Sequence, residues 1–575
     1  MHDLVVKGGL VVDGTGAAPR TADVAITDGI VTDVGRVSGN ARETLDADGL
    51  VVTPGFVDVH THFDGQITWD PLLTPTCWHG VTTVVMGNCG VGFAPAAPDK
   101  HEWLIGLMEG VEDIPGAALS AGIQWGWESF PEYLDAVDQM PKMLDVGTQV
   151  PHGAVRGYVM GERGARNEPA TPDDIAAMAA IVREGIAAGA LGFSTSRTIV
   201  HMAIDGEPVP GTFAAEDELF GIGAVLGELG TGVFELAPAG ALGEDLAAPD
   251  REMDWMRRLS ASIGRPVTFA LTQNDHDPEA WRRMLDLCSQ AAAEGAHVRP
   301  QVAGRPVSLL LGLQTFHPFA YCPSWGPLGL MSIPERVARM RDPELRRTLL
   351  AEAQSSDPAF SQFLDPERIF PLGAPPDYEP ARATSLAAQA RATGRTPLEV
   401  FYDALMDDDG AALVLRPLLN YSDFNLDSVR AMLEHPTSAW GLGDGGAHCG
   451  TTCDASTPTF MLTHWVRDRA EGRLALEWVV RKMTSETAAL YGLGDRGVLA
   501  PGMLGDCNLI DLDGLTLHAP RMVHDLPGDG RRFVQGADGY VATVKRGEVT
   551  LRAAADQGAR PGRLVRGARQ APVSV

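Results

Sequence analysis

Short apolar stretches separated by turn residues open the chain, and this pattern predicts β-strands. Residues 4–6 and 24–27 have the composition of strands with hairpin turns between them. A similar texture returns late in the chain, at residues 507–511. We therefore predict that residues 1–54 and 490–555 form one small β-sandwich-like domain, built from both ends of the chain.

Between those ends, apolar strand-like runs alternate with helical patterns, which is typical of βα units around a parallel sheet. The clearest helix begins at Thr171, an N-cap residue followed by Pro172 and two aspartates. Gly189 is expected to end this helix, and residues 190–194 follow as the next strand after a short connection. The alternation predicts an α/β fold, a TIM-type (β/α)8 barrel over residues 55–489.

Two segments do not fit the alternation. Residues 301–395 are rich in proline and aromatic side chains, which predicts long active-site loops or a lid inserted into the barrel. Residues 556–575 carry arginines among glycine, alanine and proline. This composition favours a disordered, solvated tail over a binding element.

Length and composition allow two folded units, since the chain has 575 residues of which 45% are hydrophobic. The formal net charge of -29 opposes nucleic acid or an anionic membrane as a partner, because such partners need a basic surface. A small-molecule substrate fits better.

The chain has no run as long as a membrane span and no signal-peptide pattern, and its seven scattered cysteines indicate reduced thiols. We therefore expect a cytoplasmic protein, and the sequence leaves its oligomeric state open, homo-oligomers included.

The most informative polar residues are His60 and His62, which follow an apolar stretch. Residues i and i+2 on a strand point the same way, so two imidazoles at the end of a strand can share one metal ion. By itself the pair is equally compatible with two surface histidines after a strand. The Pro-Gly-Phe-Val-Asp segment before them, residues 54–58, favours the metal site.

With this segment and several later ones, the chain resembles the amidohydrolase superfamily, in particular its N-acyl-D-amino-acid deacylase (D-aminoacylase) branch. The resemblance runs from the N-terminal strands to near residue 550. It implies a TIM-type barrel that uses a metal-activated water to hydrolyse an amide or cyclic amide bond of a small molecule. The segments that carry it are residues 54–62, 80–90, 151–156, 189–195, 443–445, 481–485 and 495–502.

The resemblance assigns roles to single residues. Asp444 lies where the family has its strand-eight aspartate, and a carboxylate there can bind a metal and accept a proton from the activated water. It is the candidate general base, although an aspartate in a Gly-rich loop is often only a turn residue. Cys89 lies where the family has a metal-binding cysteine, and the alternative is a small buried thiol. His152 and His448 are candidate substrate-binding residues.

Two histidines that bind metal in the family that this chain resembles are missing from the chain. The matching strands of this chain are residues 233–237 and 267–272, and neither contains histidine. The adjacent arginine and lysine, which in the family help to bind the substrate carboxylate, are absent too. Glu235 is a candidate substitute ligand because it lies on the strand face of an empty ligand position, although it could equally pair with a barrel arginine. We therefore expect N-acyl-D-amino acids to be poor substrates.

One set of the family's metal ligands is complete: His60, His62 and Asp444. Catalytic zinc prefers three protein ligands and a water, so we expect one Zn²⁺ per chain. Two other interpretations stay open. The barrel could perform another metal-assisted reaction, such as ester hydrolysis or a lyase reaction, or it could be a non-catalytic descendant that binds a ligand. The intact ligand set favours an enzyme.

Overall fold

The computed structural model describes residues 1–354 and 364–572, and its centre is an eight-stranded parallel sheet. The sheet curls until its two edges meet, because a parallel bridge joins Thr61 to Gly445. The expected curled parallel sheet is therefore present. Its strands, in order of pairing, are β6 (Phe56–Asp58), β7 (Val81–Met86), β8 (Asp145–Pro151), β9 (Gly192–Ser196), β10 (Val233–Ala237), β11 (Val267–Ala270), β12 (Val298–Val302) and β16 (Ala439–Trp440).

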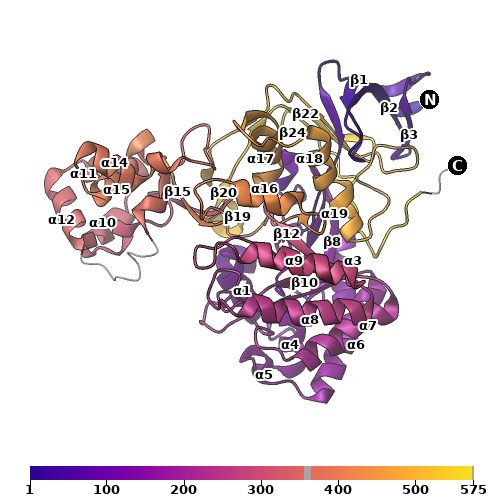
Figure 1. The fold of residues 1–575 in the computed structure, drawn as a ribbon, viewed down its shortest axis with the longest axis horizontal. Helices are drawn as coiled ribbons and strands as arrows, with labels where there is room; N and C mark the ends of the chain where they lie inside the picture. The colour runs from indigo at the N-terminus through magenta and orange to yellow at the C-terminus, as the bar shows by residue number, and fades with distance from the viewer. Residues whose placement is uncertain (355–363, 573–575) are drawn as a thin grey trace.

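Helices between successive strands pack around the sheet (Figure 1). The predicted helix α6 (Pro172–Ala188) begins after a capping box between Thr171 and Asp174 and ends at Gly189, whose φ of 118° suits glycine. No helix among the described residues is long and apolar enough to cross a membrane. The other helices around the sheet are α1 (His101–Glu112), α2 (Gly116–Gly122), α3 (Phe130–Gln139), α4 (His152–Met160), α5 (Glu162–Ala165), α7 (Glu216–Leu229), α8 (Ala248–Ile263), α9 (Ala280–Ala293), α16 (Asp427–Glu434), α17 (Thr457–Phe460), α18 (Leu476–Met483) and α19 (Ser485–Leu490).

Strands from both ends of the chain share one nine-stranded sheet. Strands β5 and β17 join the two ends in antiparallel pairing, with Val51 opposite Ile510 and Pro54 opposite Cys507. The division into a separate β-sandwich-like domain stays a prediction. The members of the sheet are β1 (His2–Val11), β2 (Arg20–Thr27), β3 (Ile30–Gly35), β4 (Ala41–Asp46), β5 (Val51–Pro54), β17 (Cys507–Ile510), β22 (Tyr540–Lys545), β23 (Glu548–Arg552) and β24 (Ala555–Asp556).

A helical unit with its own hydrophobic core projects from the barrel between β12 and β16 (Figure 1). It overlaps the predicted insertion at residues 301–395, of which residues 355–363 lie outside the described residues. Helices rather than irregular loops fill most of it, and capping boxes start two of them, at Ser332 and Thr396. Its elements are β13 (Val307–Leu311), β14 (Phe370–Pro371), β15 (Val414–Leu419), α10 (Gly326–Gly329), α11 (Ile333–Met340), α12 (Pro343–Gln354), α14 (Leu386–Thr393) and α15 (Pro397–Ala404).

The C-terminal segment differs from the predicted disordered tail. Val146 N donates to Arg563 O at 3.0 Å, and Val565 N donates to Val146 O at 2.8 Å, so the segment pairs with the start of β8. Leu564 and Val565 are buried. These two apolar side chains anchor a segment whose arginine, glycine and proline content suggested solvation. These contacts do not support a fully solvated tail around residues 563–565, and residues 573–575 lie outside the described part of the chain.

Candidate metal centre

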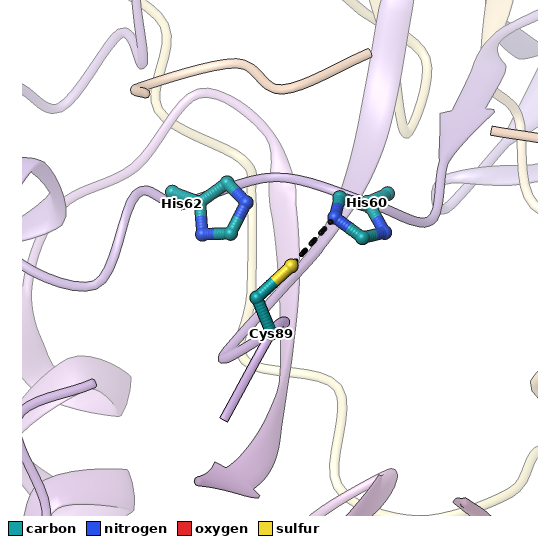
Figure 2. Close-up of side chains that lie close together, drawn as sticks. All are labelled: His60, His62 and Cys89. Carbon is teal, nitrogen blue, oxygen red and sulfur yellow. Dashed lines mark hydrogen bonds between the residues drawn. The ribbon is translucent and has the colours of Figure 1, made fainter. Parts of the chain in front are cut away.

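Three buried donor side chains converge at the carboxyl ends of β6 and β7 (Figure 2). His60 and His62 follow β6, Cys89 follows β7, and one donor atom of each lies within 4.8 Å of the others. Cys89 Sγ is 3.4 Å from His60 Nε2. Cys89 has a φ of 55°, so the chain turns sharply there and brings the thiol under the two rings. The structure thus brings these three predicted residues together.

Asp444 reaches the same point from the opposite edge of the sheet, after β16. Its Oδ1 lies 3.5 Å from His60 Nε2 and 3.9 Å from His62 Nε2. The backbone pairing that joins the sheet edges fixes this position, since Asp444 N donates to His60 O at 3.0 Å. Burial raises the pKa of Asp444 well above its ordinary range, and repulsion by Asp454 and Asp58 adds to the rise.

The second nitrogen of each ring faces an acceptor. His60 Nδ1 lies 3.1 Å from Gln301 Oε1, and His62 Nδ1 lies 3.3 Å from Glu112 Oε1. Gln301 Oε1 can accept a hydrogen bond from His60 Nδ1, which leaves the Nε2 lone pair of that ring directed toward Asp444. His62 Nδ1 and Glu112 Oε1 are close together, but neither has a hydrogen-bond partner among the described residues. Burial lowers the pKa of His60 to about 4 and that of His62 well below its usual value. Both rings are therefore neutral, which is the form that binds metals.

Glu112 and Gln301 contact the two histidines and were missed by the sequence-based reasoning. Glu112 is the last residue of α1 and also approaches His448, with Oε2 at 3.7 Å from Nε2. Its backbone oxygen accepts the His448 N–H. Gln301 is 241 residues from His60 in sequence, so closure of the sheet is what brings them together. The one sequence feature that could have pointed to Glu112 is the acidic pair Glu112-Asp113 at the end of an apolar helix.

Glu235, on β10, lies beside His60 and Cys89. Its Oε2 accepts the Cys89 N–H at 2.9 Å, while Oε1 is 3.8 Å from His60 Nδ1 and has no hydrogen-bond partner among the described residues. Burial raises the pKa of Glu235 to about 8. Within the described chain no arginine forms an ion pair with it, so Glu235 lies beside the donor cluster and not in a barrel ion pair.

His152 does not reach the cavity, and this corrects its predicted substrate-binding role. It begins α4 and is fully buried between Thr195 Oγ1 at 2.8 Å and Glu218 Oε1 at 2.9 Å. Glu218 also accepts from Arg156. The ring therefore completes a structural network next to α7, because the turn from β8 into α4 directs it away from the donor cluster. His448, by contrast, lines the cavity.

The donor groups open into a cavity of about 310 Å³. Its polar lining includes His60, His62, Cys89, His201, His448, four threonines and two acids, Glu112 and Asp444. Among the described residues that line it, none is lysine or arginine. Two neutral imidazoles, a thiol and buried carboxylates without a cationic side chain are a donor set that fits a divalent metal ion.

The comparisons with known proteins agree with the motif resemblance. A model described as the amidohydrolase family matches residues 43–551. N-acyl-D-glutamate deacylase of Alcaligenes xylosoxydans xylosoxydans is 27% identical over 524 residues, which are 89% of this chain and 88% of that protein.

Two solved structures share the fold over nearly the whole chain. A D-aminoacylase structure has a TM-score of 0.65 at 24% identity and covers 98% of this chain and 100% of that one. N-acyl-D-glutamate deacylase from Bordetella bronchiseptica, in complex with zinc and a phosphonate inhibitor, has a TM-score of 0.63 at 23% identity, with coverage of 98% and 99%.

Proposed function

Because the chain belongs to the amidohydrolase family, as its motifs predicted, we propose that it hydrolyses an amide or cyclic amide bond of a small molecule with one divalent metal ion. The family and its deacylase relatives make the protein a hydrolase of carbon–nitrogen bonds other than peptide bonds. One observation carries the proposed mechanism: His60 Nε2 and His62 Nε2 both lie within 3.9 Å of Asp444 Oδ1 at the base of one cavity.

His60, His62 and Asp444 would hold the metal, and Cys89 is close enough to join as a fourth donor. Zinc suits this set, since catalytic zinc takes nitrogen, oxygen and sulfur donors and three protein ligands. The zinc in the N-acyl-D-glutamate deacylase complex supports the same choice. When bound, a divalent metal polarises the substrate carbonyl and lowers the pKa of water.

Asp444 moves the proton. Its side chain lines the cavity, and as a carboxylate it takes a proton from the attacking water and delivers it to the nitrogen that leaves. The water oxygen bonds to the carbonyl carbon and the carbon–nitrogen bond breaks, with its electron pair going to nitrogen. The products are a carboxylic acid and an amine, on one molecule if the amide was cyclic.

The other residues position the reacting groups and exclude water. Gln301 holds the ring of His60 in one tautomer, and Glu112 lies 3.3 Å from Nδ1 of His62, where a small movement would let it do the same. Both histidines are almost fully buried, so bulk water reaches the reaction centre only through the cavity.

Hydrolysis assays on purified protein test this proposal. The released amine is measured for a panel of N-acyl amines and cyclic amides, before and after removal of metal by a chelator and readdition of Zn²⁺. We expect hydrolysis that disappears with the metal and returns with zinc. Activity that is insensitive to complete metal removal would contradict the proposal, and ligand binding without any hydrolysis would favour the non-catalytic alternative.

A further inference from the structure

We infer that the active site takes an uncharged amide, one side of which is an aliphatic group packed against strands β13 and β15. The inference rests on the proposed function and names its substrate class. Three features of the cavity carry it: an aliphatic wall, an apolar path to the surface, and the absence of a cationic side chain from the described lining.

The wall opposite the donor groups is aliphatic and comes from the inserted unit. Val307 and Leu309 of β13 and Leu418 and Leu419 of β15 line the cavity. Side chains alternate along a strand, so Val307 and Leu309 share one face, while Leu310 points the other way into the main core. The two strands thus contribute one valine and three leucines to the lining of the cavity.

The apolar lining continues to the surface. Leu242 and Leu442 line the cavity beside this wall. Val200 lines the cavity and is 39% exposed, and its neighbour Ile199 is 46% exposed. An aliphatic group in the cavity can therefore contact apolar side chains both inside it and at its exposed part near Val200, where burial of its surface favours binding.

The charges in the cavity exclude a carboxylate from the substrate. Glu112 and Asp444 would already balance a divalent cation, and no lysine or arginine of the described lining supplies further positive charge. A substrate carboxylate would meet only uncharged donors there, such as His201 and threonine hydroxyls, and no cationic side chain to offset the loss of its hydration. Sites that bind carboxylates instead use an arginine fork or a lysine.

A matched pair of amides tests the inference. N-Hexanoyl-3-methylbutylamine and N-hexanoyl-D-leucine differ only by the carboxylate of the amine portion. We expect kcat/KM of the zinc-loaded parent protein to be at least about 100-fold higher for the neutral amide, because the carboxylate would be buried unpaired. Equal or higher kcat/KM for N-hexanoyl-D-leucine would overturn the inference.

Binding separates this inference from the proposed function. Titration calorimetry of both compounds with the parent protein is expected to show tighter binding of the neutral amide. That preference without turnover would contradict the proposed hydrolysis and leave the substrate class intact. Tighter binding of the carboxylate compound, or binding of neither compound, would overturn the substrate class.

A charge placed in the wall provides the reciprocal test. Leu309→Lys puts a flexible ammonium group into the aliphatic wall. We expect the ratio of kcat/KM for N-hexanoyl-D-leucine over the neutral amide to rise at least about 10-fold. Leu330→Lys makes the same change on the surface of the inserted unit, where Leu330 is 92% exposed, and should leave the ratio unchanged. If Leu309→Lys does not fold, Leu418→Lys replaces it; a folded variant with an unchanged ratio would contradict the inference.

Discussion

At the residue scale, the site depends on where two imidazole protons reside. Gln301 Oε1 and Glu112 Oε1 lie next to the Nδ1 atoms of His60 and His62, on the side of each ring away from Asp444, so the Nε2 atoms are the ones available to bind a metal. The ligand histidines could be predicted because their spacing on a strand is visible in sequence. The residues that orient them could not, because only the closure of the sheet and the packing of α1 bring them near.

Glu112→Gln tests the orienting role. The amide keeps the shape of the side chain but can present an NH₂ group to His62 Nδ1, which disfavours the ligating tautomer. We expect zinc affinity to fall about 10- to 100-fold, measured by competition with a chromophoric chelator, and saturating zinc to restore turnover. Glu102→Gln, an exposed change on the same helix, is the control. Parent-like zinc affinity of Glu112→Gln would rule out this role.

Asp444→Asn tests the proton transfer. The substitution preserves size and removes the base, so kcat at saturating zinc should fall by roughly two to four orders of magnitude while the fold survives. Asp173→Asn, at an exposed position on α6, should behave like the parent. A folded Asp444→Asn protein that keeps most of its activity would refute the assignment.

His152 shows the limit of motif matching at this scale. The family motif at residues 151–156 correctly predicts that His152 lies at the end of β8, but the motif does not tell in which direction the side chain points. The contacts with Thr195 and Glu218, which come from other elements, decide that direction.

At the scale of elements, local sequence patterns predicted individual helices, whereas the pairing of strands far apart in the chain could not be predicted. The capping box of α6 is visible in sequence, and the Ser-x-x-Glu and Thr-x-x-Glu patterns at Ser332 and Thr396 mark helices by the same rule. The pairing of β13 with β15 joins segments about a hundred residues apart, so no local pattern contains it. That pairing supplies the aliphatic wall of the cavity.

The C-terminal segment gives an element-scale prediction. Leu564 is 5% exposed and belongs to the main core, so Leu564→Ala should lower the free energy of unfolding by roughly 2–5 kcal/mol. Urea unfolding of the variant and the parent measures this difference. Leu330→Ala, at a site that is 92% exposed, should stay within about 0.5 kcal/mol of the parent. A Leu564→Ala protein as stable as the parent would show that the segment does not contribute to the fold.

At the scale of the whole molecule, buried charges join the barrel to the sheet shared by the chain ends. Asp145, at the start of β8, lies 2.9 Å from Lys545 Nζ, 2.8 Å from Arg496 and 2.9 Å from Arg546. These cations hold the pKa of Asp145 below its usual range. The sequence indicated that strands from both ends belong together, but not that one aspartate of the barrel would form ion pairs with three cations from the C-terminal part.

The central claim is that one divalent metal is held by His60, His62 and Asp444 and makes the protein an amide hydrolase. The most direct measurement is the metal content of protein purified without chelators, determined by elemental mass spectrometry, for the parent and for the double variant His60→Ala with His62→Ala. The account predicts one equivalent of zinc in the parent and none in the folded double variant. Two equivalents in the parent, or one equivalent retained by the double variant, would contradict it.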